Sequence, residues 1–488
     1  MVPPERRLHA DPLWVTVLAL SCCACGGGDA GLALDPASGS SFGHFPVEID
    51  LSGLGIAPES VTGVAVGGVP TYQLDEAQGE LLTVWVQGHP EGGEVDLVIA
   101  AGDVEHRFSK AFEYQTPSDP VFERMVAIGA SLSQGVQAGV PSYHGSLQSP
   151  PSLIGQRVGA YLSLPLLVPG LFPAMQPSDI GPAPECEVPD VASYVAESAV
   201  EVLGHLTDDS GEFGYHNARV DPDMMPRNLS VGGTNIGHLV DGYPTDDFGV
   251  QFVAHLVLDP YGGLIDEIPW TQMELLEAED PTLVVSTDLF GNDIIGAFLL
   301  GEELSLEFVT EAEAFQVDLD EVLERLSATG AEVFLATLPR PSLLPATSEK
   351  GTAMIEAGTA TEQEVAELVD TVDGVAADYN DRLEEGAGSY DNIHVVDLAQ
   401  AVVEFEADGL QVGGQTITVE KFGGLLSLDG VHFSDLGYAL VANQFMDVMT
   451  QELGVQLDGI DLEAVLADDP YAPDTLRDGG LDPEDCDR

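Results

Sequence analysis

Hydrophobic residues follow two different patterns along the chain. Between residues 32 and 116 they form short runs that alternate with polar residues and are separated by Gly, Pro and Asp turns. The runs are Val47–Leu51, Val61–Val66, Leu81–Val86 and Val95–Ile99. Such alternation, with a turn about every ten residues, is typical of the half-buried strands of a small β-sandwich. The pattern therefore predicts an all-β domain at residues 32–116.

The longer segment at residues 122–453 alternates patterns of buried strands with patterns of helices. Continuous apolar runs predict strands at Met125–Ile128, Leu283–Ser286, Val333–Leu338 and His394–Val396. Apolar residues at helical spacing predict helices at Gln251–Leu258, Ala312–Ser327, Thr361–Leu383 and Leu436–Leu453. This alternation predicts an α/β domain with a parallel sheet, in which functional residues lie at the carboxyl ends of the strands.

One long segment, from Tyr161 to Asp223, interrupts the alternation and is rich in proline and apolar residues. Long segments of this kind are often functional, so it could form a lid or an acyl-binding wall over an active site. The alternative is a surface insertion that folds against its own domain. Both interpretations stay open from the sequence.

The start of the chain has the pattern of an export signal. Arg6 and Arg7 precede the apolar stretch Leu13–Leu20, which is too short for a membrane span and is followed by cysteines and glycines. The cysteines resemble a bacterial lipobox, which makes Cys22 and Cys23 lipidation candidates. A plain cleaved signal peptide is the alternative. Residues 1–28 therefore predict an extracytoplasmic protein, either a membrane-anchored lipoprotein or a secreted or periplasmic protein.

The charge of the chain is strongly acidic. Among 488 residues, 83 are Asp or Glu and 15 are Lys or Arg, which gives a formal net charge of -68. Such a charge repels nucleic acid and anionic membrane surfaces, so we expect no nucleic-acid partner and membrane attachment only through a lipid anchor. Acidic residues are densest at residues 454–488, where we predict a disordered tail.

Two cysteines, Cys186 and Cys486, lie outside the export segment. An extracytoplasmic location permits a disulfide between them. Separation along the chain does not show whether their α carbons approach, so two free thiols remain equally compatible with the sequence.

Candidate catalytic residues lie near both ends of the α/β segment. Ser131 stands in Gly129-Ala130-Ser131-Leu132-Ser133, directly after a predicted strand, and Asp429 and His432 are three residues apart in one late loop. A serine on the turn that leaves a strand exposes its hydroxyl, and a neighbouring Asp–His pair supplies a general base and the group that orients it. This combination predicts a serine hydrolase.

Two further positions could stabilise the oxyanion that forms during acyl transfer. Gly233 ends the stretch 228–233, where a backbone without a side chain can approach a substrate closely. Asn292 follows the predicted strand Leu283–Ser286 and opens a helical pattern, so it would present its side-chain amide at a strand end. Both groups are candidate hydrogen-bond donors to a tetrahedral intermediate.

These four segments, in this order and spacing, resemble the SGNH hydrolases, also called the GDSL lipase/esterase family. The resemblance implies a three-layer α/β/α, flavodoxin-like parallel sheet. It implies that Ser131 is the nucleophile, His432 the general base and then acid, and Asp429 the residue that orients His432. It also implies an oxyanion hole made by the backbone N–H groups of Ser131 and Gly233 and the side chain of Asn292, with no cofactor and no metal.

Two positions depart from the family pattern. The usual Asp before the serine is Ala130, and the glycine expected two places before the asparagine is Phe290, with Gly291 one place late. The first change removes a side chain that helps to hold the turn, and the second could displace Asn292. These departures keep open a catalytically inactive surface-binding protein.

Other hydrolase classes fit less well. An α/β-hydrolase turn requires Gly-x-Ser-x-Gly, whereas position 133 is Ser. The sequence has no His-Glu-x-x-His helix and no Cys/His cluster with zinc spacing.

The N-terminal domain has a resemblance of its own. The stretches Asp35–Gly39, Val66–Val69 and Phe112–Tyr114 are similar to an IPT/TIG immunoglobulin-like module. This resemblance implies an immunoglobulin-like sandwich that serves as a spacer or binds a polysaccharide or another surface partner.

Together, these patterns and the resemblance to the SGNH hydrolases imply an exported carboxylic-ester hydrolase that forms an acyl–Ser131 intermediate. Lipids, acylated sugars and small esters remain alternative substrates. An O-acyltransferase or a thioesterase on the same fold remains an alternative function.

Overall fold

The computed structural model describes residues 32–73, 79–172, 175–183, 186, 188, 202, 204–207, 213–245, 247–263, 266–299, 304–483 and 485–486. The export segment, with the lipidation candidates Cys22 and Cys23, lies outside these residues. Within the described part of the chain, no helix is long and apolar enough to span a bilayer.

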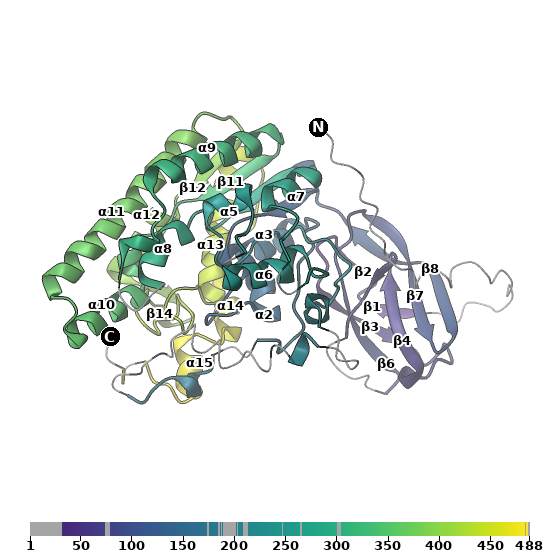
Figure 1. Ribbon diagram of the computed structural model, residues 1–488. Helices are drawn as coiled ribbons and strands as arrows, with labels where there is room; N and C mark the ends of the chain where they lie inside the picture. Colours follow the sequence, from purple (N-terminus) through teal and green to yellow (C-terminus); the bar gives the residue numbers. More distant parts are fainter. Residues whose placement is uncertain are drawn as a thin grey trace.

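The N-terminal strands form two sheets, which lie beside the helical part of the molecule in Figure 1. The strands are β1 (Ala33–Asp35), β2 (Ser38–Ser40), β3 (Phe45–Asp50), β4 (Val61–Val66), β5 (Val69–Pro70), β6 (Leu81–Val86), β7 (Gly93–Ala101) and β8 (Val104–Gln115). One sheet has the order β1-β3-β6 and the other β2-β8-β7-β4-β5, and all neighbours except β2 and β8 are antiparallel. The four predicted strands are confirmed as β3, β4, β6 and β7.

The two sheets share one hydrophobic core. Alternate residues of β3 and β6, such as Val47 and Val84, are buried against Val64 of β4 and Leu97 of β7. The polar residues between them face outward, which explains the alternation in the sequence. We call this unit the β domain.

The β domain is joined to the rest of the chain by a buried aromatic side chain. Phe42 is 1% exposed and packs among Leu153 and Ile154 of α3 (Pro150–Val158). A Cβ atom at Gly155 would lie 2.9 Å from the Phe42 ring, so the absence of a side chain there makes room for it. The hydroxyl of Tyr72 also lies 2.9 Å from that of Tyr143 in α2 (Tyr143–Gln148).

We expect Phe42→Ala to lower the free energy of unfolding by about 3 to 5 kcal/mol, because it leaves a cavity between the two domains. Chemical denaturation of the purified protein measures this change. Phe308→Ala is the control, since Phe308 is 39% exposed and its loss should cost less than about 1 kcal/mol. Equal stability of the two variants would contradict the docking of Phe42.

The second unit, which we call the α/β domain, is built on a parallel sheet. Its strands are β9 (Met125–Ala127), β10 (Leu283–Ser286), β11 (Glu332–Ala336) and β12 (Ile393–Val396), in the order β12-β11-β10-β9. All four match predicted strands. A single parallel bridge between Ala127 and Asn228 extends the sheet beyond β9.

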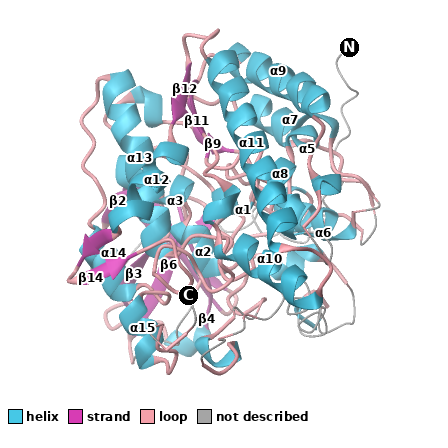
Figure 2. Ribbon diagram, turned by 90° about the vertical axis from the view of Figure 1, so that its left-hand side faces the viewer, coloured by secondary structure: helices cyan, strands magenta, loops and turns pink. Residues whose placement is uncertain are grey.

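Helices cover both faces of this sheet, as Figure 2 shows. One face packs against α5 (Ile236–Asp241), α6 (Phe248–Leu258), α7 (Gln272–Ala278), α8 (Asn292–Leu299), α9 (Ala312–Ala328), α10 (Pro345–Ala357) and α11 (Glu362–Ala387). The other packs against α3, α12 (Leu398–Asp408), α13 (Asp435–Leu453) and α14 (Leu462–Asp468). The strands are apolar throughout because neighbouring residues, such as Val284 and Val285, enter opposite cores.

The remaining elements are short. They are α1 (Ser131–Gln134), α15 (Pro473–Asp478), the antiparallel pair β13 (Leu410–Val412) and β14 (Gln415–Ile417), and the 3-10 helices η1 (Pro58–Ser60), η2 (Pro120–Phe122), η3 (Pro177–Asp179), η4 (Tyr215–Ala218), η5 (Leu306–Phe308) and η6 (Pro341–Leu343). The four predicted helices are confirmed as α6, α9, α11 and α13.

The described parts of the segment Tyr161–Asp223 pack against the α/β domain. Leu162, Leu164 and Leu166 belong to the core beside α13. Leu171 is buried with residues of α6 and η4. For these residues, the structure agrees with an insertion that folds against its own domain.

The prediction of a disordered tail is wrong for the described residues beyond 453, which include α14 and α15. Tyr471, Leu476 and Leu481 are buried against Phe422 and Leu428 of the α/β domain. The prediction weighed the high charge of the tail and gave too little weight to these few apolar side chains, whose burial stabilises it.

A disulfide joins Cys186 to Cys486, with an S–S distance of 2.07 Å and a sequence separation of 300 residues. It links the insertion to the tail. We expect Cys486→Ser to lower the free energy of unfolding by about 2 to 5 kcal/mol, because a long loop is no longer closed in the unfolded chain. Denaturation with and without dithiothreitol measures the loss. The reductant should destabilise the parent but not the variant, and equal midpoints for all samples would contradict the disulfide.

Candidate active site

The turn that carries Ser131 connects the first strand of the parallel sheet to a short helix. Ser131 is the first residue of α1 and follows β9 after three residues. Gly129 has φ +126°, and a Cβ atom there would lie 2.8 Å from the side-chain oxygens of Asp288 and Ser286. Only glycine fits this position without strain. The turn leaves Ser131 partly exposed while its neighbours Ala130 and Ser133 are buried.

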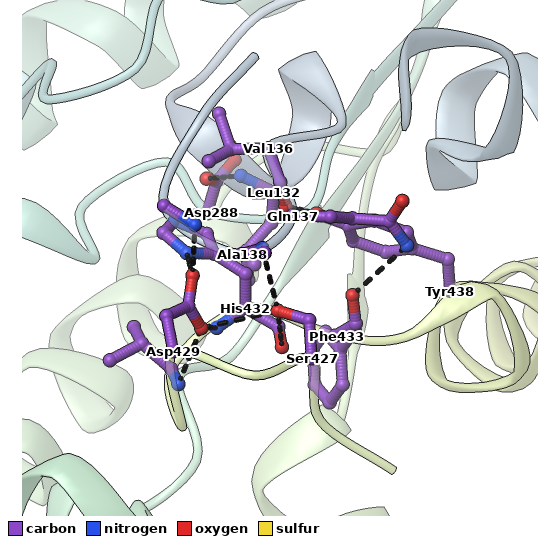
Figure 3. Close-up of polar contacts among 12 residues, drawn as sticks. Leu132, Val136, Gln137, Ala138, Asp288, Ser427, Asp429, His432, Phe433 and Tyr438 are labelled. Atoms are coloured by element: carbon purple, nitrogen blue, oxygen red, sulfur yellow. Dashed lines mark hydrogen bonds and ion pairs between the residues drawn. The ribbon is translucent and has the colours of Figure 1, made fainter. Parts of the chain in front are cut away.

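Asp429 and His432 form the contact that their spacing predicted. The Nδ1 atom of His432 lies 2.7 Å from Oδ2 of Asp429, as Figure 3 shows. The other carboxylate oxygen accepts the backbone N–H groups of Val431 and His432, each at 2.9 Å. Gly139 donates a third backbone N–H to Oδ2 at 2.6 Å. Asp429 is therefore held in one orientation, with the imidazole bound through Nδ1 and Nε2 left for proton transfer.

The environment keeps Asp429 ionised. Burial by itself would raise the pKa of this carboxyl. The charge of His432 and the hydrogen bonds from its ring and from the backbone outweigh burial, so the pKa of Asp429 lies below its ordinary value. An ionised carboxylate can stabilise a positively charged imidazole when His432 takes up a proton.

Hydrogen bonds connect the segment that begins with the Ser131 turn to the segment that carries His432. The carbonyl of Ser131 accepts the N–H of Val136 at 2.9 Å, and the carbonyl of Val136 accepts the Tyr438 hydroxyl at 2.5 Å. Ala138 then donates its N–H to Ser427 Oγ at 2.9 Å (Figure 3). The hydrogen bonds of the described residues include none between Ser131 Oγ and His432, and such bonds are often long without substrate.

The predicted oxyanion donors Gly233 and Asn292 lie close to each other and near Ser131. A Cβ atom placed on Gly232 would lie 3.8 Å from that of Ser131, which puts the stretch Gly232–Gly233 beside the serine. Gly233 has φ +86°, and a Cβ atom there would lie 2.8 Å from Val250, so glycine is required. Asn292 Nδ2 donates to the carbonyl of Thr234 at 2.9 Å, which places this amide next to Gly233.

Two structural details concern the segments that carry Gly233 and Asn292. Gly233 does not follow a regular strand. Its segment meets the sheet through the bridge between Asn228 and Ala127, and Val231 adds one N–H to the carbonyl of Gly129 at 3.1 Å. Phe290 does not separate Asn292 from the glycine segment. Its ring is 1% exposed and packs edge-on against Phe315, with ring centroids 5.3 Å apart, so the larger residue fills the core below the site.

Buried polar side chains that were not predicted also support the site. Gln134 Oε1 accepts the N–H of Gly232 at 2.9 Å, and Asn228 Nδ2 donates to the carbonyl of Ser133 at 2.9 Å. Asp288 lies beneath the Ser131 turn. Asp288 lies two residues after the end of β10, and this position was its only available signal, because polar residues at strand ends face the site. Gln134 and Asn228 carried no such signal. Among the described residues, no group of three His, Cys, Asp or Glu side chains could hold a metal ion.

The structure combines a parallel sheet covered by helices on both faces with a turn at Ser131, and hydrogen bonds connect the segment that follows Ser131 to the loop of Asp429 and His432. The sequence model of the GDSL-like lipase/acylhydrolase family matches residues 125–445, and the chain belongs to this family. No curated protein matches the chain. Among solved structures, the crystal structure of the acetyl xylan esterase AlAXEase is similar over 45% of this chain and 78% of its own, with 17% identity and a TM-score of 0.25.

Proposed function

We propose that the protein is an exported serine hydrolase that cleaves carboxylic esters through an acyl–Ser131 intermediate. Membership of the GDSL-like lipase/acylhydrolase family supports ester hydrolysis in general. The observation that carries the proposal is the 2.7 Å contact between His432 Nδ1 and a buried, fully hydrogen-bonded Asp429, in a loop bonded to the Ser131 turn. An inactive binding protein would have no need for this arrangement.

In the proposed reaction, Ser131 Oγ attacks the ester carbonyl while His432 Nε2 takes the serine proton. Asp429 holds the ring and stabilises its positive charge. The N–H groups of Ser131 and Gly233 and the side chain of Asn292 donate hydrogen bonds to the tetrahedral oxyanion. His432 then protonates the departing alcohol. Water, activated by the same histidine, attacks the acyl group and releases the acid.

We further propose that the β domain is an IPT/TIG-like module and that the chain is exported, either as a lipoprotein acylated at Cys22 or Cys23 or in secreted form. Lipids, acylated sugars and small esters are the candidate substrates. The contacts of Phe42 and Tyr72 support a β domain that is fixed to the catalytic domain as a rigid support. An O-acyltransferase or a thioesterase would use the same acyl-enzyme and differ in the incoming nucleophile or in the leaving group.

Hydrolysis of p-nitrophenyl esters from acetate to palmitate, by protein lacking residues 1–28, tests the proposed function. We expect saturable release of p-nitrophenol that ranks the acyl lengths. Because the chain carries a net charge of -68, the assay is run at low and high salt. Release no faster than the buffer blank for every ester would contradict the proposed esterase. Faster turnover with an added alcohol than with water would identify an acyltransferase.

A further inference from the structure

We propose that Asp288 is a positioning residue for the proposed hydrolysis: it clamps the backbone around Ser131 and leaves the Ser131 N–H free for the oxyanion. This inference rests on the proposed function. Asp288 stands 158 residues from Ala130, which occupies the place of the family's usual Asp.

The contacts of Asp288 surround the nucleophile. Its Oδ1 accepts the N–H of Ala130 at 3.1 Å and that of Ser133 at 3.2 Å. Its Oδ2 accepts the N–H of Leu132 at 2.6 Å, a contact drawn in Figure 3. The hydroxyl of Ser133 donates to Oδ1 at 2.6 Å. One carboxylate thus binds the residues on both sides of Ser131.

The backbone amide of Gly129, at the start of the turn, is bound by a different side chain. Gln272 Oε1 accepts the N–H of Gly129 at 2.9 Å, and Gln272 Nε2 donates to the carbonyl of Gly129 at 2.9 Å. Of the five amides from Gly129 to Ser133, four therefore have a buried side-chain acceptor. The hydrogen bonds of the described residues include none from the N–H of Ser131. The pattern singles out the amide that the proposed mechanism uses.

The chemistry of these contacts requires an ionised carboxylate. Asp288 is 5% exposed, and every one of its contacts at the turn comes from a donor. A carboxylate has about four acceptor sites and no proton to donate, which matches three N–H groups and one hydroxyl. Burial raises the pKa of Asp288, and these hydrogen bonds act against that rise. An asparagine of the same shape would turn an NH₂ group toward at least one backbone N–H.

The contacts of Asp288 affect catalysis because the proposed oxyanion hole depends on the direction in which the Ser131 N–H points. Removal of a single oxyanion donor typically lowers turnover by about 100- to 1000-fold. Asp288 does not touch the substrate in this scheme. It acts through the backbone, so its loss should weaken binding of the tetrahedral state and leave binding of the ester nearly unchanged.

Asp288→Asn is the principal test. We expect kcat to fall by about 100-fold with KM changed by less than about threefold. The inhibition constant of a trifluoromethyl ketone, which adds to the serine and forms an oxyanion, should rise by a similar factor. Hydrogen–deuterium exchange of the peptide containing residues 129–133 should become faster, because three amides lose their acceptor.

A matched control separates positioning from general loss of stability. Asp373 accepts the N–H of Ser342 at 2.9 Å and its hydroxyl at 2.5 Å, the same pair of groups that Ser133 offers to Asp288. Asp373→Asn should leave kcat, the ketone affinity and the exchange of residues 129–133 unchanged at a temperature where both variants are folded. Should Asp288→Asn fail to fold, Ser133→Ala removes one of the four donors and should lower kcat by about tenfold.

The two proposals fail in different ways. If the wild type hydrolyses esters and Asp288→Asn keeps its kcat and its slow exchange, Asp288 does not position the turn. Unchanged exchange and kcat in Ser133→Ala would have the same meaning. If the wild type hydrolyses no ester, the proposed function fails. The exchange of residues 129–133 then still decides whether Asp288 holds the turn.

Discussion

Ser131→Ala is expected to lower kcat for ester hydrolysis by about 10⁵- to 10⁶-fold, the largest effect that we expect from one substitution in this chain. The variant keeps the proposed oxyanion donors and the Asp429–His432 pair but has no atom that can form the acyl-enzyme. Its folding should not change, because the Ser131 side chain makes no hydrogen bond among the described residues and is partly exposed.

Two measurements check this result. Initial rates with the best p-nitrophenyl ester give the loss of kcat, and the mass of protein treated with a fluorophosphonate shows whether one adduct forms on the parent and none on the variant. Ser133→Ala is the matched control, two residues away, with an expected loss of about tenfold. An adduct on the Ser131→Ala protein, or a loss no greater than that of the control, would assign the nucleophile elsewhere.

Asp429→Asn is expected to lower kcat by about 10⁴-fold while KM changes little. The carboxylate accepts a hydrogen bond from His432 Nδ1 and three more from backbone N–H groups. The NH₂ group of an asparagine at this position would face N–H donors and could not accept their hydrogen bonds. The imidazole would then lose the tautomer that places a lone pair on Nε2. The resulting positive charge on the ring would also lose its counterion.

Steady-state kinetics of Asp429→Asn across pH, beside circular dichroism to verify folding, check the expected loss. Asp397→Asn is a control at a helix cap, where Oδ1 accepts the N–H of Gln400 and no predicted catalytic residue is touched. It should keep kcat within about threefold. An Asp429→Asn protein with more than a tenth of the parent activity would contradict the proposed role.

The same substitution has a consequence for acid stability. Because the pKa of Asp429 is lower in the folded protein than its ordinary value of about 4, its ionised form stabilises the fold above that value. This contribution is lost as the pH falls through the lowered pKa. The denaturation midpoint of the parent should therefore fall more steeply below about pH 4 than that of Asp429→Asn.

Much of the α/β domain was predictable because local patterns report burial directly. The apolar run Leu283–Ser286 is β10, and the helical spacing within Ala312–Ser327 is α9, nearly to the residue. Ser131, Asp429 and His432 could also be selected as candidates, since a serine after a strand and an Asp–His pair at a spacing of three residues are local features. The close approach of His432 and Asp429 required only their own loop.

The structure differed from the sequence predictions, or decided between them, where segments far apart in the sequence meet. The tail is folded because a few apolar residues, including Leu476, pack against Phe422 and its neighbours. The sequence of the tail alone does not show which residues it packs against. The disulfide joins cysteines 300 residues apart, so only the packing of the insertion against the tail decides it. Phe290 leaves Asn292 in place because the core has room for its ring beside Phe315.

Hydrophobic periodicity and short spacings act within one element, so they were enough to predict the order of these strands and helices and to select the candidate residues of the Asp429–His432 loop. The contacts that hold the Ser131 turn come instead from residues far away in the sequence. The carboxylate expected at position 130 is replaced by Asp288, which lies at the end of the neighbouring strand and is far away along the chain. Hydrogen bonds depend on distance in space, and the parallel pairing of β9 with β10 brings this carboxylate beneath the serine.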